Sequence, residues 1–231
     1  MEHPFPATAR PTVTSASSFL TSVYGWMTAG LGLTAVVALF TASSQAMLQL
    51  VFGNRLVFFG LIIAEFGLVI ALSAAIRRLS ATAATGLFLL YSALSGVTFA
   101  AIFLAYTSSS IASAFFVTAG TFGAMSLYGY LTKRDLSSWG SFFFMGLVGF
   151  LLASLVNLWL QSAMIYWVTT YLGIFIFVGL TAYDTQKIKN LGAAGLSGAE
   201  HRKAAILGAL TLYLDFVNLF LLLLRVFGRR R

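Results

Sequence analysis

Three acidic residues lie inside long apolar stretches of the sequence, namely Glu65, Asp184 and Asp215. A charged side chain at the centre of a membrane-spanning helix costs roughly 2.5 to 3.5 kcal/mol on insertion scales, so its presence there points to a functional site. These carboxyls are therefore the first candidates for chemistry, and proton binding and cation binding are the two kinds of chemistry that carboxyls perform most directly.

Asp215 is the strongest of the three candidates, because it stands near the middle of the last apolar stretch among leucines and phenylalanines. In a helix, steps of three and four residues place Thr211, Asp215, Asn218 and Arg225 on one face. Such a polar stripe must face the interior of a helix bundle or water. The alternative interpretation is a buried carboxylate that is satisfied by its neighbours and has no further role.

Asp184 and Glu65 allow more than one interpretation. Asp184 stands where the sixth apolar stretch gives way to a basic loop, so it is a functional carboxyl, an ion-pair partner of Lys187, or a cap of the following turn. Glu65 lies in the second apolar stretch, which ends at Arg77 and Arg78. These arginines are placed to contact a carboxylate on another helix.

A meeting of Asp184 and Asp215 across two helices would create a proton-sensitive pair. Two buried carboxyls cannot both ionise at low cost, so one proton is shared between them. When both are ionised, the pair offers several oxygen ligands to a hard cation such as calcium. Both residues are therefore candidates for proton sensing and for transient calcium contact.

The composition predicts the elements that position these residues. The 231 residues are 59% hydrophobic and only 9% charged, against roughly 25% charged residues in ordinary globular domains. Apolar stretches of about 20 residues follow one another, as membrane-spanning helices require. We expect an all-α integral membrane protein with a flexible polar tail over residues 1–18 and a single transmembrane domain over 19–231, whose spans cover residues 19–40, 56–76, 85–106, 111–131, 141–160, 164–183 and 205–227.

The positive charges predict the orientation of the bundle. The net charge is +8, but the basic residues are dispersed between the apolar stretches, which argues against a nucleic-acid surface. They follow the second, fourth and sixth spans, so these loops and the N-terminus are expected in the cytoplasm. Arg229, Arg230 and Arg231 would then lie outside, so the last segment either crosses fully, which we favour, or dips into the bilayer and returns. The loop residues concerned are Arg77, Arg78, Lys133, Arg134, Lys187, Lys189, Arg202 and Lys203.

Several other chemistries are excluded by residue type. The chain has no cysteine, and both histidines, His3 and His201, lie outside the predicted spans. Thiol catalysis, a serine and histidine protease within the membrane and a histidine metal site are therefore not expected. No phosphate-binding glycine loop or metalloprotease motif is found, and no cofactor is expected.

Small residues recur four positions apart within the predicted spans. Such pairs allow helix backbones to approach closely, which stabilises helix bundles in lipid. The sequence contains four examples: Gly25 with Ala29, Gly60 with Ala64, Gly96 with Ala100, and Gly149 with Ala153.

Four segments of the chain resemble the Bax inhibitor-1 family of membrane proteins. They are VYGWMTAG from Val23, YLTKRDLS from Tyr130, VGLTAYDTQK from Val178 and LYLDFVNLFL from Leu212. The resemblance covers nearly the whole chain and is closest to bacterial members, which implies a multi-pass protein of the bacterial inner membrane.

The resemblance also implies a fold and a function. The fold is a seven-helix bundle whose last helix is enclosed by two three-helix brackets. The function is a proton-sensitive calcium leak controlled by two aspartates, which correspond to Asp184 and Asp215. Glu65 matches a glutamate of the family pattern. In the family pattern, an arginine near the end of the second helix contacts the first of these aspartates as a latch. The matching position in this sequence is Ile76. The candidate latch is therefore the next residue, Arg77, which lies about 100° further around the helix.

These residues allow three functions of different classes. A calcium-permeable leak channel is favoured, with the bilayer, calcium ions and protons as partners and no enzymatic activity. The alternative is a membrane-embedded regulatory partner of another membrane protein, such as a quality-control protease. An intramembrane aspartyl protease is more remote, because the residues before Asp215 lack the Gly-x-Gly-Asp motif and no proline follows Pro11.

Overall fold

The computed structural model describes residues 13–231, and within them the chain forms helices joined by short loops. Seven of these helices are long and apolar enough to cross a membrane, which confirms the predicted all-α membrane bundle. They are α1 (Val13–Ser43), α3 (Arg55–Ala75), α4 (Ala81–Ala105), α5 (Ser108–Leu131), α6 (Ser137–Leu160), α7 (Ala163–Ala193) and α8 (Gly198–Phe227).

Two features of the first part of the chain differ from the predicted segments. Helix α1 begins at Val13, so its first residues occupy part of the predicted tail, while residues 1–12 lie outside the described part of the chain. A short helix, α2 (Gln45–Phe52), fills the loop predicted after the first span. The hydroxyl of Ser44 accepts a hydrogen bond from the Met47 amide at the start of α2, which is the capping that begins a helix.

The same capping chemistry sets the beginnings of the long helices. The hydroxyls of Ser80, Thr107 and Ser162 each accept a hydrogen bond from the amide three residues further on, at 3.1, 3.4 and 3.4 Å. At the start of α3, the side-chain oxygen of Asn54 accepts a hydrogen bond of 2.9 Å from the Leu56 amide, two residues further on. These small polar residues satisfy amides that have no partner in the first helical turn.

Helices α7 and α8 extend well beyond the apolar stretches that predicted them. The predicted spans ended at 183 and began at 205, whereas α7 continues to Ala193 and α8 begins at Gly198. No glycine or proline interrupts residues 180–191, and the chain leaves α7 only near Gly195, whose φ of 72° lies in the left-handed region. Asp184 therefore lies within a helix and not at its end.

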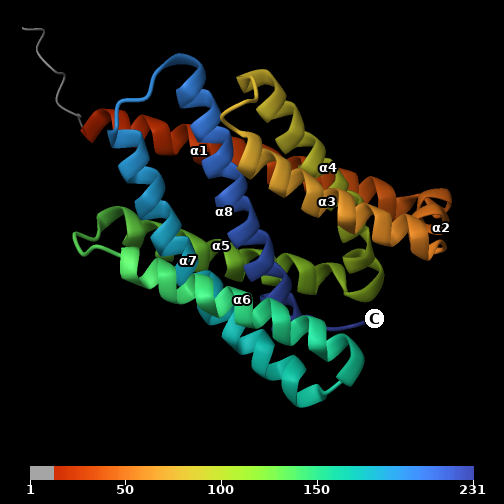
Figure 1. The fold of residues 1–231 in the computed structure, drawn as a ribbon. Helices are drawn as coiled ribbons and strands as arrows, with labels where there is room; N and C mark the ends of the chain where they lie inside the picture. Colours follow the sequence, from red (N-terminus) through yellow and green to blue (C-terminus); the bar gives the residue numbers. More distant parts are fainter. Residues whose placement is uncertain (1–12) are drawn as a thin grey trace, which may run out of the picture.

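Helix α8 forms the centre of the bundle (Figure 1). In the most apolar 18-residue segment of α8, 67% of the residues are buried, against 6% in the corresponding segments of α3 and α6. One bracket, formed by α1, α3 and α4, and a second bracket, formed by α5, α6 and α7, pack around it. This arrangement confirms the predicted fold class.

The two brackets meet along two seams that differ in packing. In the closed seam, α1 packs against α7. In the open seam, α3 faces α6; α3 packs on α4 and α2, and within residues 13–231 it makes no comparable contact with α6. Figure 1 looks onto the open seam, with α8 visible between α3 and α6.

Contacts at the two ends of α8 show that the last helix crosses the whole bundle. Near its start, the Lys203 ammonium donates to the carbonyl of Arg77 at 3.4 Å. Beyond its end, the Thr107 amide donates to the Arg229 carbonyl at 3.2 Å, and the Arg231 amide donates to the Ala105 carbonyl at 3.1 Å. The segment therefore does not dip in and return, and its terminal arginines lie at the end opposite to the loop after α3.

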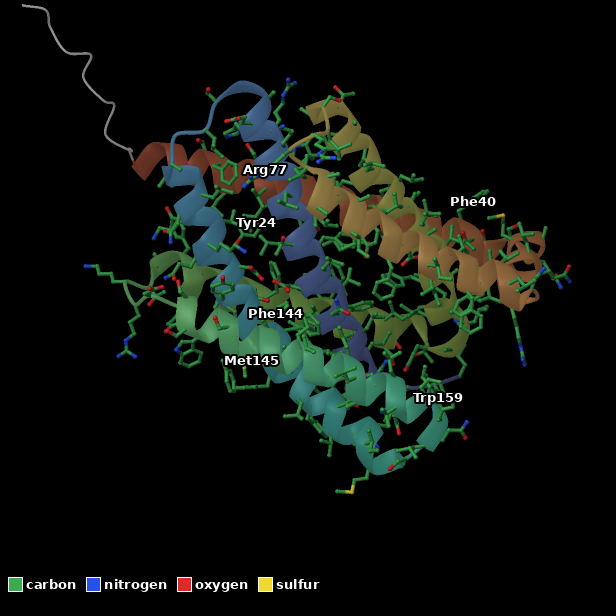
Figure 2. All side chains as sticks on the ribbon, viewed as in Figure 1. Tyr24, Phe40, Arg77, Phe144, Met145 and Trp159 are labelled. Atoms are coloured by element: carbon green, nitrogen blue, oxygen red, sulfur yellow. The ribbon has the colours of Figure 1, made fainter. Side chains whose placement is uncertain are left out.

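The outside of the bundle carries large apolar side chains. Phe40 and Trp159, both visible in Figure 2, have exposed fractions of 67% and 80%. An apolar surface of this kind is matched by the hydrocarbon of a bilayer, which agrees with the membrane location.

Candidate functional site

Asp184 on α7 and Asp215 on α8 lie next to each other in the interior of the bundle. Their exposed fractions are 8% and 4%, and their carboxyls are in hydrogen-bonding contact. Ionised carboxylates can only accept hydrogen bonds, so a hydrogen bond between the two requires one proton on the pair. The structure thus brings together the two aspartates that the sequence singled out.

The aspartate pair lines a cavity of about 820 Å³ at the open seam. Side chains from α3, α4, α6, α7 and α8 form its walls, and most of them are apolar. Phe66 on α3 and Met145 on α6 line the cavity although they are 62% and 70% exposed on the outside of the bundle. The cavity is therefore continuous with the lipid-facing surface between these helices.

One carboxyl oxygen of the pair has no hydrogen-bond partner. Oδ2 of Asp215 is buried and unpartnered within the part of the chain that the structure describes. The two polar neighbours on its own helix are engaged elsewhere: Thr211 donates to the Leu207 carbonyl at 3.1 Å, and Asn218 donates to the Leu214 carbonyl at 2.8 Å. A buried polar atom without a partner is unfavourable, so this oxygen is a place where a ligand or ion would be stabilised.

Glu65 lies on the α3 wall of the same cavity. Its carboxylate is half-buried and accepts a hydrogen bond of 3.0 Å from the Thr98 hydroxyl of α4. Three carboxyls from three helices therefore line one cavity, and Glu65 belongs to the bracket that faces the aspartate pair.

The two candidate cations occupy different places. Lys187 lines the cavity one turn after Asp184, with a favourable electrostatic interaction between them, and its Nζ lies 5.8 Å from the centre of the Tyr183 ring. Arg77 is exposed beyond the end of α3 and is not among the residues that line the cavity. Figure 2 shows Arg77 at one end of the bundle, well apart from Phe144 on α6, which also lines the cavity.

A buried hydroxyl pair holds the neighbouring part of α8 in place. The Tyr213 hydroxyl lies 2.7 Å from the Thr34 hydroxyl of α1, which also lies 2.8 Å from the Ser92 carbonyl of α4. Tyr213 is completely buried, with an exposed fraction of 0%. Since it is two residues from Asp215, this contact ties the central helix to the first bracket beside the aspartate pair.

Nothing in the sequence indicated that Gln186 and Lys189 contact the end of α5 and the loop that follows it; Gln186 was not singled out, and Lys189 was expected only as a cytoplasmic charge. Gln186 accepts from the Leu136 amide at 2.9 Å and donates to the Arg134 carbonyl at 2.8 Å. Lys189 donates to the Tyr130 carbonyl at 2.7 Å. The available signal was their position, since both follow Asp184 by less than two helical turns.

The same loop contains an acidic residue outside the membrane-spanning segments. Asp135 accepts a hydrogen bond of 2.9 Å from the Ser137 amide. Hydrogen bonds from Ser137 lower the pKa of Asp135 below its ordinary value of 3.8. Asp135 is exposed and lies outside the cavity, which makes it a useful control for the buried aspartates.

The site has the donor set for weak cation binding. Among residues 13–231, no group of three or more histidines, cysteines, aspartates or glutamates is arranged to hold a metal ion. The pair of carboxyls alone offers oxygen ligands of the kind that calcium prefers, which suits a transient contact.

Comparison with known proteins agrees with this architecture. A family model described as "Inhibitor of apoptosis-promoting Bax1" matches residues 16–231. The inner membrane protein YbhL of Escherichia coli is 60% identical over 216 residues, which cover 93% of this chain and 92% of that protein. Uncharacterized proteins of Borreliella burgdorferi and Deinococcus radiodurans are 46% and 44% identical, over 93% and 96% of this chain and 93% and 95% of their own lengths.

These matches cover the brackets, the central helix and both aspartates. Together with the seven spanning helices they confirm the predicted multi-pass protein of the inner membrane. The chain therefore belongs to the Bax inhibitor-1 family.

Proposed function

We propose that the protein is a pH-sensitive, calcium-permeable leak channel controlled by Asp184 and Asp215. One observation carries this proposal: two buried carboxyls from adjacent helices meet at the wall of a cavity, and one of their oxygens has no hydrogen-bond partner. Proton binding changes the charge of such a pair directly, and the adjoining cavity leaves space for the surrounding helices to move in response.

The proton controls the distance that the two helices prefer. With one proton, the carboxyls attract each other through a hydrogen bond; without it, two carboxylates in contact repel each other. Lys187 is the cation nearest to offset that repulsion. Helices α3 and α6 are the least constrained walls of the cavity, because α3 packs mainly on α4 and α2, and α6 packs mainly on α7. A change at the pair therefore moves α3 and α6 relative to each other most easily.

The ligand chemistry favours calcium as a transient occupant. Asp184 of α7 and Asp215 of α8 line the cavity, and Glu65 lines it from α3. Permeation requires an ion site that is attractive enough to enter and weak enough to leave. Two aspartates without further protein ligands meet that requirement better than a complete calcium cage would.

Arg77 remains the predicted latch, and Lys187 is a second candidate for the same role. In the structure Lys187 is the residue that interacts with Asp184, while Arg77 lies beyond the end of α3. Replacing each by glutamine separates the two: the residue that restrains the pair shifts the pH at which the flux changes, and the other leaves it in place.

We further propose that the N-terminus is cytoplasmic. The loops after α3 and α5 carry basic residues, and so do the adjoining ends of α7 and α8, as cytoplasmic segments do. The opposite end also carries arginines, Arg55 and those after α8, so the charge rule is less one-sided here than in many membrane proteins. Because the chain has no cysteine, a single cysteine at Arg134 or at Arg229 can be labelled in whole cells with an impermeant reagent; only Arg229→Cys should react.

The proposed function is tested by calcium flux into dye-loaded liposomes while the external pH is stepped. Asp215→Asn and Asp184→Asn preserve shape and remove charge, and Asp135→Asn is the matched control in an exposed loop. We expect the flux of the wild type and of Asp135→Asn to change with pH, and the flux of either cavity variant to be independent of pH. No flux from folded wild-type protein at any pH would contradict the channel and favour a regulatory partner in the membrane, without enzymatic activity of its own.

A further inference from the structure

The cavity at the open seam combines three properties that a channel vestibule does not require together. It opens sideways to the lipid-facing surface, its walls are mostly apolar, and its polar groups include three carboxyls and only one cation. We propose that it binds a single-chain amphiphile with a primary ammonium head, which enters from the bilayer between α3 and α6.

The size and lining of the cavity fit an alkyl chain. Its volume of about 820 Å³ lies within the range of small-molecule sites, roughly 300 to 1,000 Å³. The chain would lie between Phe66 and Val69 of α3 and Phe144 and Met145 of α6. Phe66, Phe144 and Met145 are 62%, 63% and 70% exposed, so a lipid-dissolved chain reaches this wall without passing through the packed core.

The polar end of the cavity fits an ammonium group. Oδ2 of Asp215 is buried, lines the cavity wall through its residue and has no hydrogen-bond donor among the described residues. An ammonium head brings three donors and a positive charge. The aspartate pair with one shared proton carries one negative charge, and Glu65 on α3 adds a second when it is ionised, so a cation is favoured over a neutral donor.

The single cation of the site does not remove this preference. Lys187 interacts with Asp184, the member of the pair that is less buried, and its Nζ also lies 5.8 Å from the Tyr183 ring. Among the described residues, Glu65 receives a hydrogen bond from the Thr98 hydroxyl and faces no cation within the cavity lining. Lys187 partly offsets the negative charge of the aspartate pair, and an ionised Glu65 would give the cavity an excess of negative charge.

The test uses dodecylamine with a photoreactive diazirine at the end of its chain. The purified protein is placed in nanodiscs of phosphatidylcholine, which has no primary amine, and cross-linked residues are mapped by mass spectrometry. We expect labelling at α3 and α6 around Val69 and Met145. Unlabelled dodecylamine should compete about tenfold or more better than dodecanol, which has the same chain without the charge.

Three variants sharpen the assignment. Asp215→Asn and Glu65→Gln each remove one charge and should weaken dodecylamine labelling without affecting the weaker competition by dodecanol. Leu151→Trp fills the cavity and should abolish labelling, while Leu155→Trp, one turn further along α6 and outside the cavity lining, should not. If Asp215→Asn fails to fold, Glu65→Gln and the two tryptophan variants still decide the question.

Two results would overturn the inference. Equal competition by dodecanol would show that the cavity recognises the chain and not the ammonium head. Labelling spread evenly over lipid-facing helices, or unchanged by Leu151→Trp, would show that the cavity is not the site. The outcome is independent of calcium flux, because the binding assay measures no ion movement; an amine site in a protein without flux would contradict the proposed leak and leave this inference intact.

Discussion

The closed and open seams join the same two brackets in opposite ways. In the closed seam, Phe19 of α1 is 1% exposed and packs so tightly on Gly192 of α7 that a Cβ on Gly192 would lie 2.8 Å from the Phe19 Cβ. The Tyr24 hydroxyl lies 3.4 Å from the Thr185 hydroxyl across the same seam. In the open seam, the described residues of α3 and α6 make no comparable contact, and the cavity of about 820 Å³ lies between them.

This difference locates the part of the bundle that is free to move. A tightly interdigitated interface resists displacement, because every shift creates voids or overlaps. A helix that packs on one side only can move at lower cost. We infer that the closed seam stays fixed and acts as a hinge. The open seam lies in front of Asp184 and Asp215, so a change in the charge of this pair should move the helices on that side.

Joining the two walls of the open seam should have the largest effect. Val69→Cys and Met145→Cys place thiols on opposite walls of the cavity in a chain that has no other cysteine. A short thiol-reactive cross-linker between them should reduce calcium flux to the level of protein-free vesicles. Linking Thr21→Cys to Leu127→Cys, which line a groove on the other side of the bundle, should leave flux unchanged; loss of flux in both would argue against a special role of the open seam.

Adding one methyl group should show how tightly the closed seam is packed. Gly192→Ala inserts a Cβ against Phe19 in the closed seam and should lower the free energy of unfolding by about 1 to 3 kcal/mol, the usual cost of overpacking. Gly67→Ala, on the exposed surface of α3 where a Cβ would meet no atom of the described residues within 4 Å, should cause no loss. Unfolding by denaturing detergent measures both, and equal effects would show that the contact between Phe19 and Gly192 is not tightly packed.

Removing one hydroxyl from the closed seam and one from the α3 wall of the cavity should give a smaller difference. Tyr24→Phe removes the contact with Thr185 and should cost about 0.5 to 1 kcal/mol, as expected for one long hydrogen bond. Thr98→Val removes the donor to Glu65. Since Glu65 is half-buried beside an open cavity, water can replace that donor, and the free energy of unfolding should hardly change. A larger loss in Thr98→Val than in Tyr24→Phe would reverse the comparison.

The smallest effect is expected at Asp135, outside both seams. Folding lowers the pKa of this carboxyl through the hydrogen bonds from Ser137, so its ionised form stabilises the fold above the ordinary pKa and loses that effect as the pH falls through the lowered value. Asp135→Asn should therefore be slightly less stable than the wild type at neutral pH and equal to it in strong acid. Melting temperatures at the two pH values check this, and a difference that persists in acid would contradict it.

The sequence predicted the spans and the aspartates because both signals are local. Each span is a continuous apolar run, and a carboxyl within such a run is conspicuous. Helical periodicity predicted a stripe of Thr211, Asp215, Asn218 and Arg225. The first three line the cavity, whereas Arg225 lies over the Tyr166 ring and outside the cavity lining. The membership of the Bax inhibitor-1 family was likewise carried by short motifs, and the family model confirmed it over residues 16–231.

The features that were not predicted depend on tertiary contacts. Asp184 was placed at the end of a helix because hydropathy falls there, yet the helix continues, since Gln186 finds partners in the loop after α5 and Lys189 finds one in the last turn of α5. Of the four pairs of small residues, only one packs at an interface: a Cβ on Gly96 would lie 2.7 Å from the Thr34 carbonyl, while those on Gly25, Gly60 and Gly149 would meet nothing. Sequence spacing cannot distinguish a helix interface from a lipid-facing groove.

The proposed movement of α3 relative to α6 is tested most directly by measuring distances across both seams as the pH changes. Spin labels are attached to pairs of introduced cysteines, one pair on α3 and α6 and the other on α1 and α7, and distances are recorded by pulsed electron spin resonance in nanodiscs. We expect the distance between α3 and α6 to shift between two values as the pH is stepped, while the distance between α1 and α7 stays constant. In Asp215→Asn, the distance between α3 and α6 should stay at a single value at every pH. A constant distance across the open seam under conditions in which calcium flux changes would contradict the proposed movement.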